Sequence, residues 1–277
     1  MSTVVRRPTL SAAISHVKIL YFGPPGTGKT ADAASLARLG RIVVVDAEGG
    51  LKRQPLEALG IPIENIELHT DIQFESIMDL LQELRAELTL DEDAYAGVAL
   101  DSLSEIQRRY LDQRASRQFK LSQGDYGENT FMMRRQVRAA LNLPTHVAVT
   151  AHGRRDEDDD GEVNYRPSLT PSVASDLLGL VDLVCYTRVT TLPESNEVAY
   201  VGCFQPGRKF VAKDRFGLLP PCLVSPTLDR VLSYTSGQFT REAVRAALDG
   251  DVRDDLDPLQ FDYIKQLKSS KSLKTGE

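Results

Sequence analysis

The hydrophobic residues of this chain gather in short runs that are apolar almost throughout, instead of alternating with polar residues. Unbroken runs of this kind are typical of strands in a parallel sheet that is covered on both faces. They predict strands at 16–23, 41–46, 97–101 and 146–152, with a further short strand at 63–70.

Between these runs the apolar positions recur at the spacing of one helix face. Helices are predicted directly after residue 30, where Gly40 supplies a stop, and near 103–119 and 128–142. Alternating strands and helices predict an α/β fold, with a mostly parallel twisted sheet and helices on both faces. The helical spacing is clearest after Asp71, where the apolar positions are Phe74, Ile77, Met78, Leu81, Leu84 and Leu88.

The pattern changes after residue 152. Residues 153–171 are polar and contain Gly and Pro, which predicts a long loop or an exposed hairpin. Strands joined by turns are expected next, and they would add antiparallel members to the C-terminal side of the sheet. These strands are predicted at 181–191, 196–205 and 208–215, and a later helix at 241–248.

The length of 277 residues fits one large α/β domain with appendages. We expect an N-terminal arm at 1–15, a core at 16–225, and a C-terminal helical segment with a lysine-dotted tail at 226–277. Three cysteines, with no C-x-x-C spacing, argue against a disulfide framework and a zinc site.

Composition bounds the location and the partners only loosely. No apolar stretch approaches the ~18 residues of a membrane span, and the N-terminus lacks the apolar core of a signal peptide. These features predict a cytoplasmic protein. The formal net charge of −6 does not advertise nucleic-acid binding. It does not exclude it either, because a local basic groove matters more than the total charge.

One segment carries a specific chemical signal. The sequence G-P-P-G-T-G-K-T follows a predicted strand and precedes a predicted helix, which is the context that confirms a phosphate-binding loop. In such a loop, glycines let backbone N–H groups turn toward the phosphates of a nucleoside triphosphate such as ATP. Lys29 is expected to reach the β- and γ-phosphates, and the Thr30 hydroxyl to hold Mg²⁺. The expected ATP-binding residues are Gly23, Pro24, Pro25, Gly26, Thr27, Gly28, Lys29 and Thr30.

Two predicted strands end on an aspartate, and each is a candidate for the magnesium strand. The run G-V-A-L-D ends on Asp101 and leads into a helix, whereas V-V-V-D ends on Asp46 and continues to Glu48. A carboxylate at the tip of a neighbouring strand is well placed to orient or deprotonate the attacking water. We therefore assign Asp101 to magnesium and Glu48 to the water, with Asp46 bracing the strand end or the loop. The alternative for Glu48 is a solvated loop residue.

This layout resembles a known family. Many chains with G-P-P-G-T-G-K-T are AAA+ proteins, but those typically place Asp-Glu together at the end of the magnesium strand. Here that position reads Asp101-Ser102, and the glutamate lies in D-A-E after the preceding strand. The arrangement resembles the RecA family, whose catalytic glutamate lies in a D-A-E turn. The resemblance covers residues 15–220 and implies a RecA-like P-loop core.

The resemblance assigns further residues. His152, at the end of H-V-A-V-T-A-H, matches the strand-end residue that senses the γ-phosphate, where bacterial RecA carries glutamine. The alternative is a polar strand-end residue. In F-V-A-K-D-R-F-G, Lys213 and Arg215 match cations that reach a neighbouring subunit's ATP, like an arginine finger. The alternative is a cationic edge strand protected from pairing.

Residues 153–171 match the position of the family's second DNA-contacting loop. Arg154, Arg155 and Arg166 suit phosphate contacts, and Tyr165 suits base stacking. Six carboxylates in the same segment would repel DNA, so we expect a hairpin with basic roots and an acidic tip. Residues 117–141 match the position where the family's first DNA loop precedes a helix, and the basic candidates there are Arg117, Lys120, Arg134 and Arg135. The alternative for Arg134 and Arg135 is a solvated helix face.

The compact core is similar to phage-encoded RecA-like proteins, which implies an ATP hydrolase that depends on DNA and lies in the host cytoplasm. The expected function is annealing or strand exchange on single-stranded DNA, with ATP and Mg²⁺ at the interfaces of a homo-oligomer. Single-strand-binding protein is an expected helper. The alternatives are a hexameric ring-forming motor or loader, a regulatory ATP-binding module without DNA contact, and a small-molecule kinase.

Overall fold

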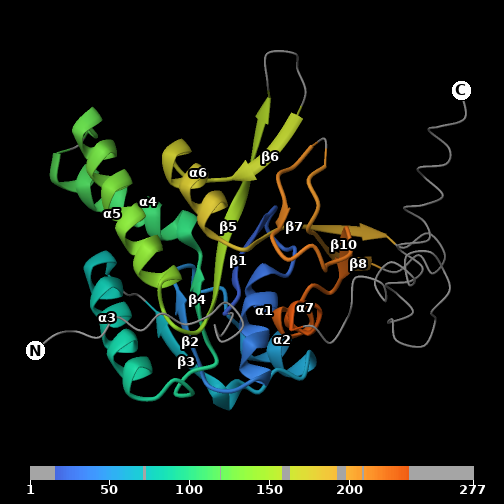
Figure 1. The fold of residues 1–277 in the computed structure, drawn as a ribbon. Helices are drawn as coiled ribbons and strands as arrows, with labels where there is room; N and C mark the ends of the chain where they lie inside the picture. Colours follow the sequence, from blue (N-terminus) through green and yellow to red (C-terminus); the bar gives the residue numbers. More distant parts are fainter. Residues whose placement is uncertain are drawn as a thin grey trace, which may run out of the picture.

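A computed structural model describes residues 16–70, 73–118, 120–157, 163–191, 198–207 and 209–236 of the chain. Within these ranges the strands and helices are arranged around one mixed sheet (Figure 1). The expected arm at 1–15, the helix at 241–248 and the lysine-dotted tail lie outside the described residues.

The sheet has the order β10-β8-β7-β1-β5-β4-β2-β3, with β6 paired to β5 and β9 paired to β7. The neighbours from β3 to β7 are parallel, and the pairs of β8 with β7 and β10 are antiparallel. The strands are β1 (Lys18–Gly23), β2 (Ile42–Asp46), β3 (Ile66–Thr70), β4 (Gly97–Asp101), β5 (His146–Glu157), β6 (Val163–Pro167), β7 (Leu183–Thr191), β8 (Val198–Cys203), β9 (Lys213–Asp214) and β10 (Cys222–Val224).

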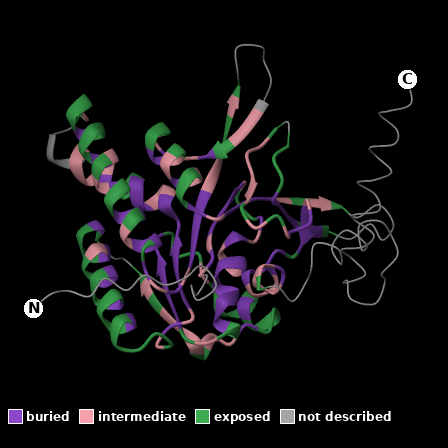
Figure 2. Ribbon diagram, in the orientation of Figure 1, coloured by how far each residue is buried: buried purple, intermediate pink, exposed green. Residues whose placement is uncertain are grey.

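Helices cover both faces of this sheet, and the side chains between the layers form two hydrophobic cores (Figures 1 and 2). The larger core lies against the α3–α6 face, and the smaller one against the α1, α2 and α7 face. The helices are α1 (Lys29–Ala34), η2 (Ser35–Arg38), α2 (Arg53–Ala58), η3 (Ile63–Asn65), α3 (Phe74–Leu90), α4 (Leu103–Gln118), α5 (Gln123–Leu141), α6 (Pro171–Leu180) and α7 (Leu228–Thr235).

The predicted fold class is confirmed: the sheet is mostly parallel, and antiparallel strands extend it at the C-terminal side. The unbroken apolar runs became β1, β2, β4 and the first half of β5, whose residues are nearly all buried. Burial on both faces removes the alternation of polar and apolar residues, which is why these strands were readable from the sequence.

One expectation about the later strands was wrong, and one strand was not predicted. Among the described residues of the run at 208–215, only Lys213 and Asp214 form a strand, β9, and the Phe210 ring stacks on Tyr186. A strand that the pattern did not predict, β10, forms the sheet edge instead. Three apolar residues are too few to give a periodic signal.

The polar segment after residue 152 forms the expected hairpin. Strand β5 continues beyond the sheet and pairs with β6, in a register that joins Gly153 to Pro167 and Glu157 to Val163. The acidic tip at 158–162 lies outside the described residues. The hairpin is therefore a continuation of β5 beyond the sheet (Figure 1), and its pairing begins at Gly153, directly after His152.

Cys185, Cys203 and Cys222 are buried free thiols, as the absence of a cysteine framework predicted. In the part of the chain that the structure describes, none of the helices is both long and apolar enough to cross a bilayer.

Candidate nucleotide-binding site

The phosphate-binding loop joins the end of β1 to the start of α1. Gly26 and Gly28 have φ angles of 72° and 88°, a region that side chains with a Cβ rarely adopt. At Gly23, a Cβ would collide with the backbone oxygen of Thr187 on β7. The loop also rests on β7 through a 2.7 Å hydrogen bond between the hydroxyls of Thr27 and Thr187. The glycines are therefore required by backbone geometry and by close packing.

Lys29 lies within the curve of this loop. Its Nζ donates to the carbonyl oxygens of Pro24, at 2.7 Å, and Gly23, at 3.2 Å. Burial lowers the pKa of Lys29, while the nearby carboxylates of Asp101 and Glu48 oppose that shift. A half-desolvated ammonium group beside loop backbone is well placed to exchange its carbonyl partners for phosphate oxygens.

Thr30 and Asp101 meet at the carboxyl edge of the sheet. The Thr30 hydroxyl donates to Oδ2 of Asp101 at 2.6 Å, and the Thr150 hydroxyl on β5 donates to Oδ1. Burial raises the pKa of the Asp101 carboxyl group, and the hydrogen bonds from Thr150 and Thr30 oppose that shift. A buried carboxylate whose partners are neutral hydroxyls gains much from a nearby cation.

Asp46 occupies the matching position on the next strand, since it is the register partner of Asp101. Its carboxylate accepts three backbone N–H groups: those of Glu48 and Gly50 at 3.1 Å each, and that of Leu51 at 2.8 Å. Asp46 therefore braces the D-A-E turn, as its place at the strand end suggested.

Glu48 projects from that turn into a polar cluster. Its Oε1 lies 3.0 Å from Nε2 of His152 and also accepts the Ser102 hydroxyl. The hydrogen bond from His152, with help from Ser102 and Lys29, lowers the pKa of Glu48 to about 2 despite partial burial. The same contact raises the pKa of His152. The sequence predicted separate roles for Glu48 and His152, and in the structure the two side chains are in direct contact.

Three residues of the site were missed in the sequence, namely Ser102, Thr150 and Thr187. Each is a buried hydroxyl in or directly after an apolar strand. A polar residue inside an otherwise apolar run was the available signal, because a buried hydroxyl needs a partner. Its partner could not be read from the sequence, since each hydrogen bond joins two different strands or a strand and the loop.

The donors at this edge fit Mg²⁺ and ATP. Mg²⁺ is commonly held by one or two protein oxygens together with substrate phosphates, rather than by a cage of side chains. Thr30 and Asp101 are such a pair, and no group of three metal-ligating side chains occurs among the described residues. Thr30 and Asp101 would hold the ion, and the loop and Lys29 would hold the phosphates.

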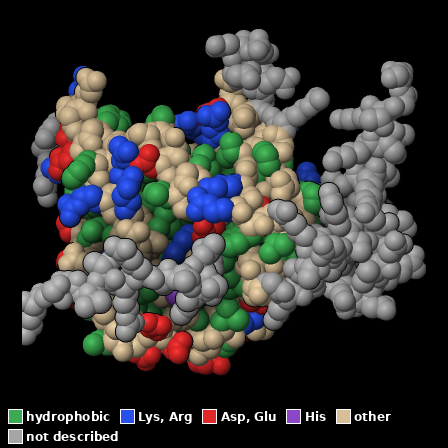
Figure 3. All heavy atoms as spheres, viewed as in Figure 1, with side chains coloured by type: hydrophobic (Ala, Val, Ile, Leu, Met, Phe, Trp, Pro, Cys, Tyr) green, Lys and Arg blue, Asp and Glu red, His purple; other side chains and the backbone are tan. Residues whose placement is uncertain are grey.

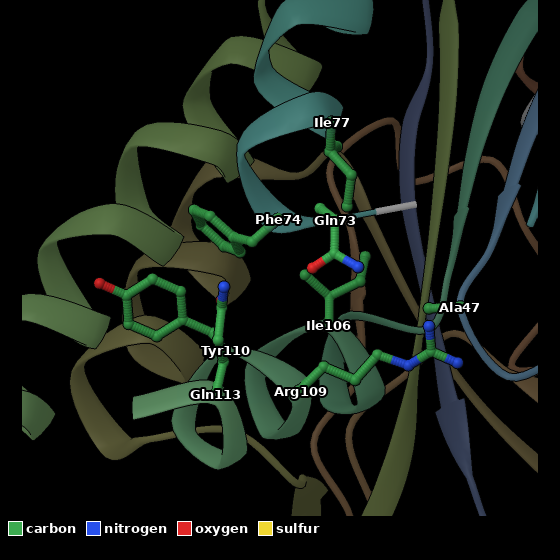
Figure 4. A pocket seen from close by; sticks show the side chains of 8 residues that line it. All are labelled: Ala47, Gln73, Phe74, Ile77, Ile106, Arg109, Tyr110 and Gln113. Carbon is green, nitrogen blue, oxygen red and sulfur yellow. The ribbon is translucent and has the colours of Figure 1, made fainter. Parts of the chain in front are cut away.

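A small cavity beside the D-A-E turn is not an alternative nucleotide site. Its volume is about 40 Å³, and the Arg109 side chain extends across it toward Ala47 (Figure 4). Sites for drug-sized ligands are typically ~300 Å³ or larger. The cavity therefore accommodates water rather than a nucleotide.

Lys213 and Arg215 lie at the end of α6 in their own subunit. The Nζ of Lys213 donates to the carbonyl oxygens of Leu178, Gly179 and Val181, at 2.7–3.1 Å. Arg215 pairs with Asp182 at 2.8 Å. These contacts cap a helix C-terminus, where cations are favoured. The predicted strand is shorter than expected, because Arg215 lies just beyond β9. Both cations nevertheless point to the same side, since each donates to the carbonyl oxygen of Gly179.

The hairpin brings together the predicted DNA-contacting residues, but they differ in solvent exposure and in their existing partners. Arg154 and Arg166 are register partners, as are Arg155 and Tyr165. Arg154, Arg155 and Arg166 are exposed, although Arg154 pairs with Asp156 at 2.7 Å. Tyr165 is only partly exposed, and its ring lies 5.6 Å from that of Tyr186. The tyrosine packs against the core, so the arginines are the accessible part of the hairpin.

The candidates at 117–141 divide in a similar way. Arg134 binds Asp176 on α6 at 2.6 Å, and the Arg135 guanidinium lies 5.9 Å from the Phe131 ring centroid. Lys120 is exposed, and the side chain of Arg117 lies outside the described residues. Arg134 therefore has a role in holding α5 to α6.

The chain was compared with protein families, curated sequences and solved structures. Residues 15–216 match the AAA_24 family, described as an AAA domain. No curated protein sequence matches the chain. Among solved structures, the chain is similar to a KaiC-like protein from the hyperthermophilic archaeon Pyrococcus horikoshii OT3. The identity is 14% and the TM-score 0.43, over 72% of this chain and 82% of that one.

The family match covers every part of the site, from β1 and the phosphate-binding loop through the hairpin to Arg215. It accounts for most of the chain and for all the residues that surround Thr30 and Asp101. The chain belongs to the AAA_24 family of AAA domains and is a P-loop ATPase.

Proposed function

We propose that this P-loop ATPase is a RecA-type recombinase, which hydrolyses ATP on single-stranded DNA and promotes annealing or strand exchange. The observation that carries the proposal is the 3.0 Å contact between Glu48 and His152. Glu48 is the candidate for activating water, and His152 stands where β5 leaves the sheet and enters the basic hairpin. A ligand on the hairpin is thereby linked to the hydrolytic site through one hydrogen bond.

The chemistry follows from the state of Glu48. A general base works best with a pKa near the operating pH, and a carboxylate whose pKa is about 2 takes a proton poorly. Held by His152 and Ser102, Glu48 accepts a hydrogen bond from water but is a weak base. Loss of the His152 contact raises its basicity. DNA-stimulated hydrolysis follows if DNA on the hairpin moves His152.

Bound ATP and Mg²⁺ would supply the reacting phosphoryl group and neutralise its charge. Lys29 and the loop amides orient the phosphates, and Thr30 and Asp101 fix the metal side. This division assigns the water to Glu48, in the turn that follows the neighbouring strand β2.

The electrostatic surface supports a polyanionic partner. In Figure 3, Lys and Arg side chains gather over the helices α5 and α6 and the root of the hairpin, with some Asp and Glu side chains among them, and further Asp and Glu side chains lie along the lower edge. A cavity of about 410 Å³ adjoins the hairpin root, and its charged lining residues are Arg108 and Arg154 together with Glu105, which pairs with Arg108. Arg108 would have to leave Glu105, and Arg154 its partner Asp156, to bind backbone phosphates here.

The test is ATPase activity with and without single-stranded DNA, at two salt concentrations. We expect DNA to stimulate turnover, and we expect salt to weaken the stimulation because phosphate contacts release counterions. Electron microscopy of the same samples should show oligomers on DNA, with filaments favouring a recombinase and hexameric rings a motor. Turnover that DNA leaves unchanged would contradict the proposal and favour the regulatory module.

A matched pair of variants locates the DNA contact. Arg154→Glu with Arg155→Glu should weaken DNA binding and leave nucleotide affinity unchanged. The control is Arg41→Glu with Arg85→Glu, which changes the net charge equally at exposed positions away from the hairpin. Equal DNA affinity in the two double variants would move the DNA site elsewhere.

A host single-strand-binding protein is part of the same proposal, as is assembly with further copies of the chain. The intrasubunit contacts of Lys213 and Arg215 mean that a role on a neighbour's ATP requires these cations to leave the end of α6. Recombination assays with added single-strand-binding protein test the first partner, and sedimentation with ATP and DNA tests the second.

A further inference from the structure

The site can hold a nucleotide in only one orientation, because the two ends of the phosphate-binding loop region face different strands of the sheet. Asp101 ends β4 and Glu48 follows β2, both on one side of β1, whereas β7, β8 and β10 lie on the other side. The contact of Thr30 with Asp101 marks the metal and γ-phosphate end. The remainder of a nucleotide must therefore extend across the loop, toward β7 and β8.

An exposed aromatic side chain stands at that second end. Tyr200 on β8 is 45% exposed, and a Cβ built on Gly28 would lie 3.5 Å from its Cδ1 atom. The ring therefore lies against the loop, one residue before Lys29. Because Phe22 on β1 pairs with Tyr186, the part of β7 after Tyr186 extends past β1 and carries its partner β8 alongside the loop.

Tyr200 is part of a small apolar surface on this face. Val189 is its register partner on β7, and Val198 lies two residues away on the same side of β8. Val189 is 45% exposed and Val198 is 65% exposed. Apolar side chains grouped beside a polar phosphate-binding loop commonly mark a ligand or partner site.

We propose that Tyr200 is the stacking platform for the nucleobase of the bound nucleotide, with Val189 and Val198 extending that platform. The inference rests on nucleotide binding at the phosphate loop. An aromatic ring offers a base a flat π-surface at little conformational cost, and stacking needs no specific hydrogen bond. The two valines add apolar area only.

The proposal predicts a substrate class. A platform that recognises a base by area, without polar groups, favours the larger purines over pyrimidines and discriminates weakly between adenine and guanine. We expect ATP and GTP to bind with similar affinity, and CTP and UTP to bind several-fold more weakly.

The chain contains no tryptophan, which makes a direct probe available. In Tyr200→Trp the only indole stands at the proposed platform, and a stacked base should quench its fluorescence. Mg-ATP should give a saturable quench, whereas inorganic tripolyphosphate should bind the loop without quenching. The control is Tyr126→Trp, because Tyr126 is 46% exposed on α5 and is remote from the loop.

Affinity measurements separate this inference from the proposal on which it rests. Tyr200→Ala should weaken ATP binding about tenfold, leave tripolyphosphate binding unchanged, and be rescued by Tyr200→Phe. Failure of the unmodified protein to bind ATP and tripolyphosphate would contradict nucleotide binding itself. Tight ATP binding with no quench, and with no loss in Tyr200→Ala, would overturn the stacking role alone. A signal that follows protein concentration instead of nucleotide would also overturn it, and would identify the surface as a contact between copies.

Discussion

Asp46 and Asp101 end neighbouring strands as register partners, and both are almost fully buried, yet they have different surroundings. Asp46 accepts three backbone N–H groups from the turn that follows it. Asp101 accepts hydroxyl groups from Thr30 and Thr150. Backbone donors belong to the fold, whereas the Thr30 hydroxyl can turn to share a metal ion with the carboxylate.

The segment that follows each aspartate accounts for the difference. After Asp46 the chain turns through Ala47 and Glu48 to glycines, and backbone N–H groups of this turn donate to both carboxylate oxygens. After Asp101 the chain enters α4 directly, so the carboxylate remains directed at the loop. We therefore expect one strand end to position Glu48 and the other to serve the metal.

The largest expected effect is at the tip of the turn. Glu48→Gln removes the carboxylate that faces water but keeps its size, so kcat for ATP hydrolysis should fall by about 10²–10⁴-fold. Equilibrium binding of ATP should remain, because Lys29 and Thr30 are unchanged. Turnover at the normal rate would assign water activation to another group.

The two aspartates should differ in stability. Asp46→Asn weakens or removes acceptors for buried backbone N–H groups, so the free energy of unfolding should fall by about 1–3 kcal/mol. Asp101→Asn should cost less, because burial already disfavours its charged form. Denaturant unfolding without nucleotide measures both. An equal loss of unfolding free energy in the two variants would contradict the view that Asp46 stabilises the turn and Asp101 serves the metal.

Much of the difference between the two strand ends could be predicted from the sequence. The phosphate loop has fixed spacing, and the strands of the core are apolar runs, so the positions of Lys29, Asp101 and Glu48 at one edge followed from chain order. Residues whose partners come from distant strands were not readable. Thr150 reaches Asp101 across 49 positions, and Tyr165 was interpreted as a base-stacking residue although it packs against Tyr186.

Lys213 and Arg215 show a second limit. Their spacing suggested cations that reach a neighbouring subunit, but both side chains bind carbonyl oxygens at the end of α6 in their own subunit. Cations on a short segment satisfy the nearest carbonyl oxygens, and sequence spacing does not reveal which oxygens are near.

These cations give a smaller expected effect. Lys213→Ala removes three hydrogen bonds to the end of α6, so unfolding should become easier by about 1–2 kcal/mol. Mixing Lys213→Ala subunits with Glu48→Gln subunits tests the intersubunit role. At some interfaces of the mixture, a subunit with an intact Glu48 would receive an intact Lys213 from its neighbour. Restored ATPase in the mixture supports that role, and its absence, with co-assembly verified, favours the helix cap alone.

The smallest effect concerns pH. The pKa of His152 is raised by Glu48 in the folded state, so its stabilising contribution is complete below pH 6.5, its unfolded value, and is lost as the pH rises through the folded pKa. For a pair this exposed the contribution is about 0.5 kcal/mol. His152→Gln should remove this pH dependence from unfolding curves measured between pH 6 and 8. An unaltered profile would show that the pair does not form in solution.

The central claim is that Asp101 and not Asp46 serves the metal. The direct measurement is the Mg²⁺ concentration that gives half-maximal ATPase activity, compared between Asp101→Asn and Asp46→Asn at a temperature where both are folded. We expect Asp101→Asn to require at least about tenfold more Mg²⁺, a change worth about 1.4 kcal/mol, and Asp46→Asn to require the normal concentration. A raised Mg²⁺ requirement in Asp46→Asn, with a normal one in Asp101→Asn, would contradict the account.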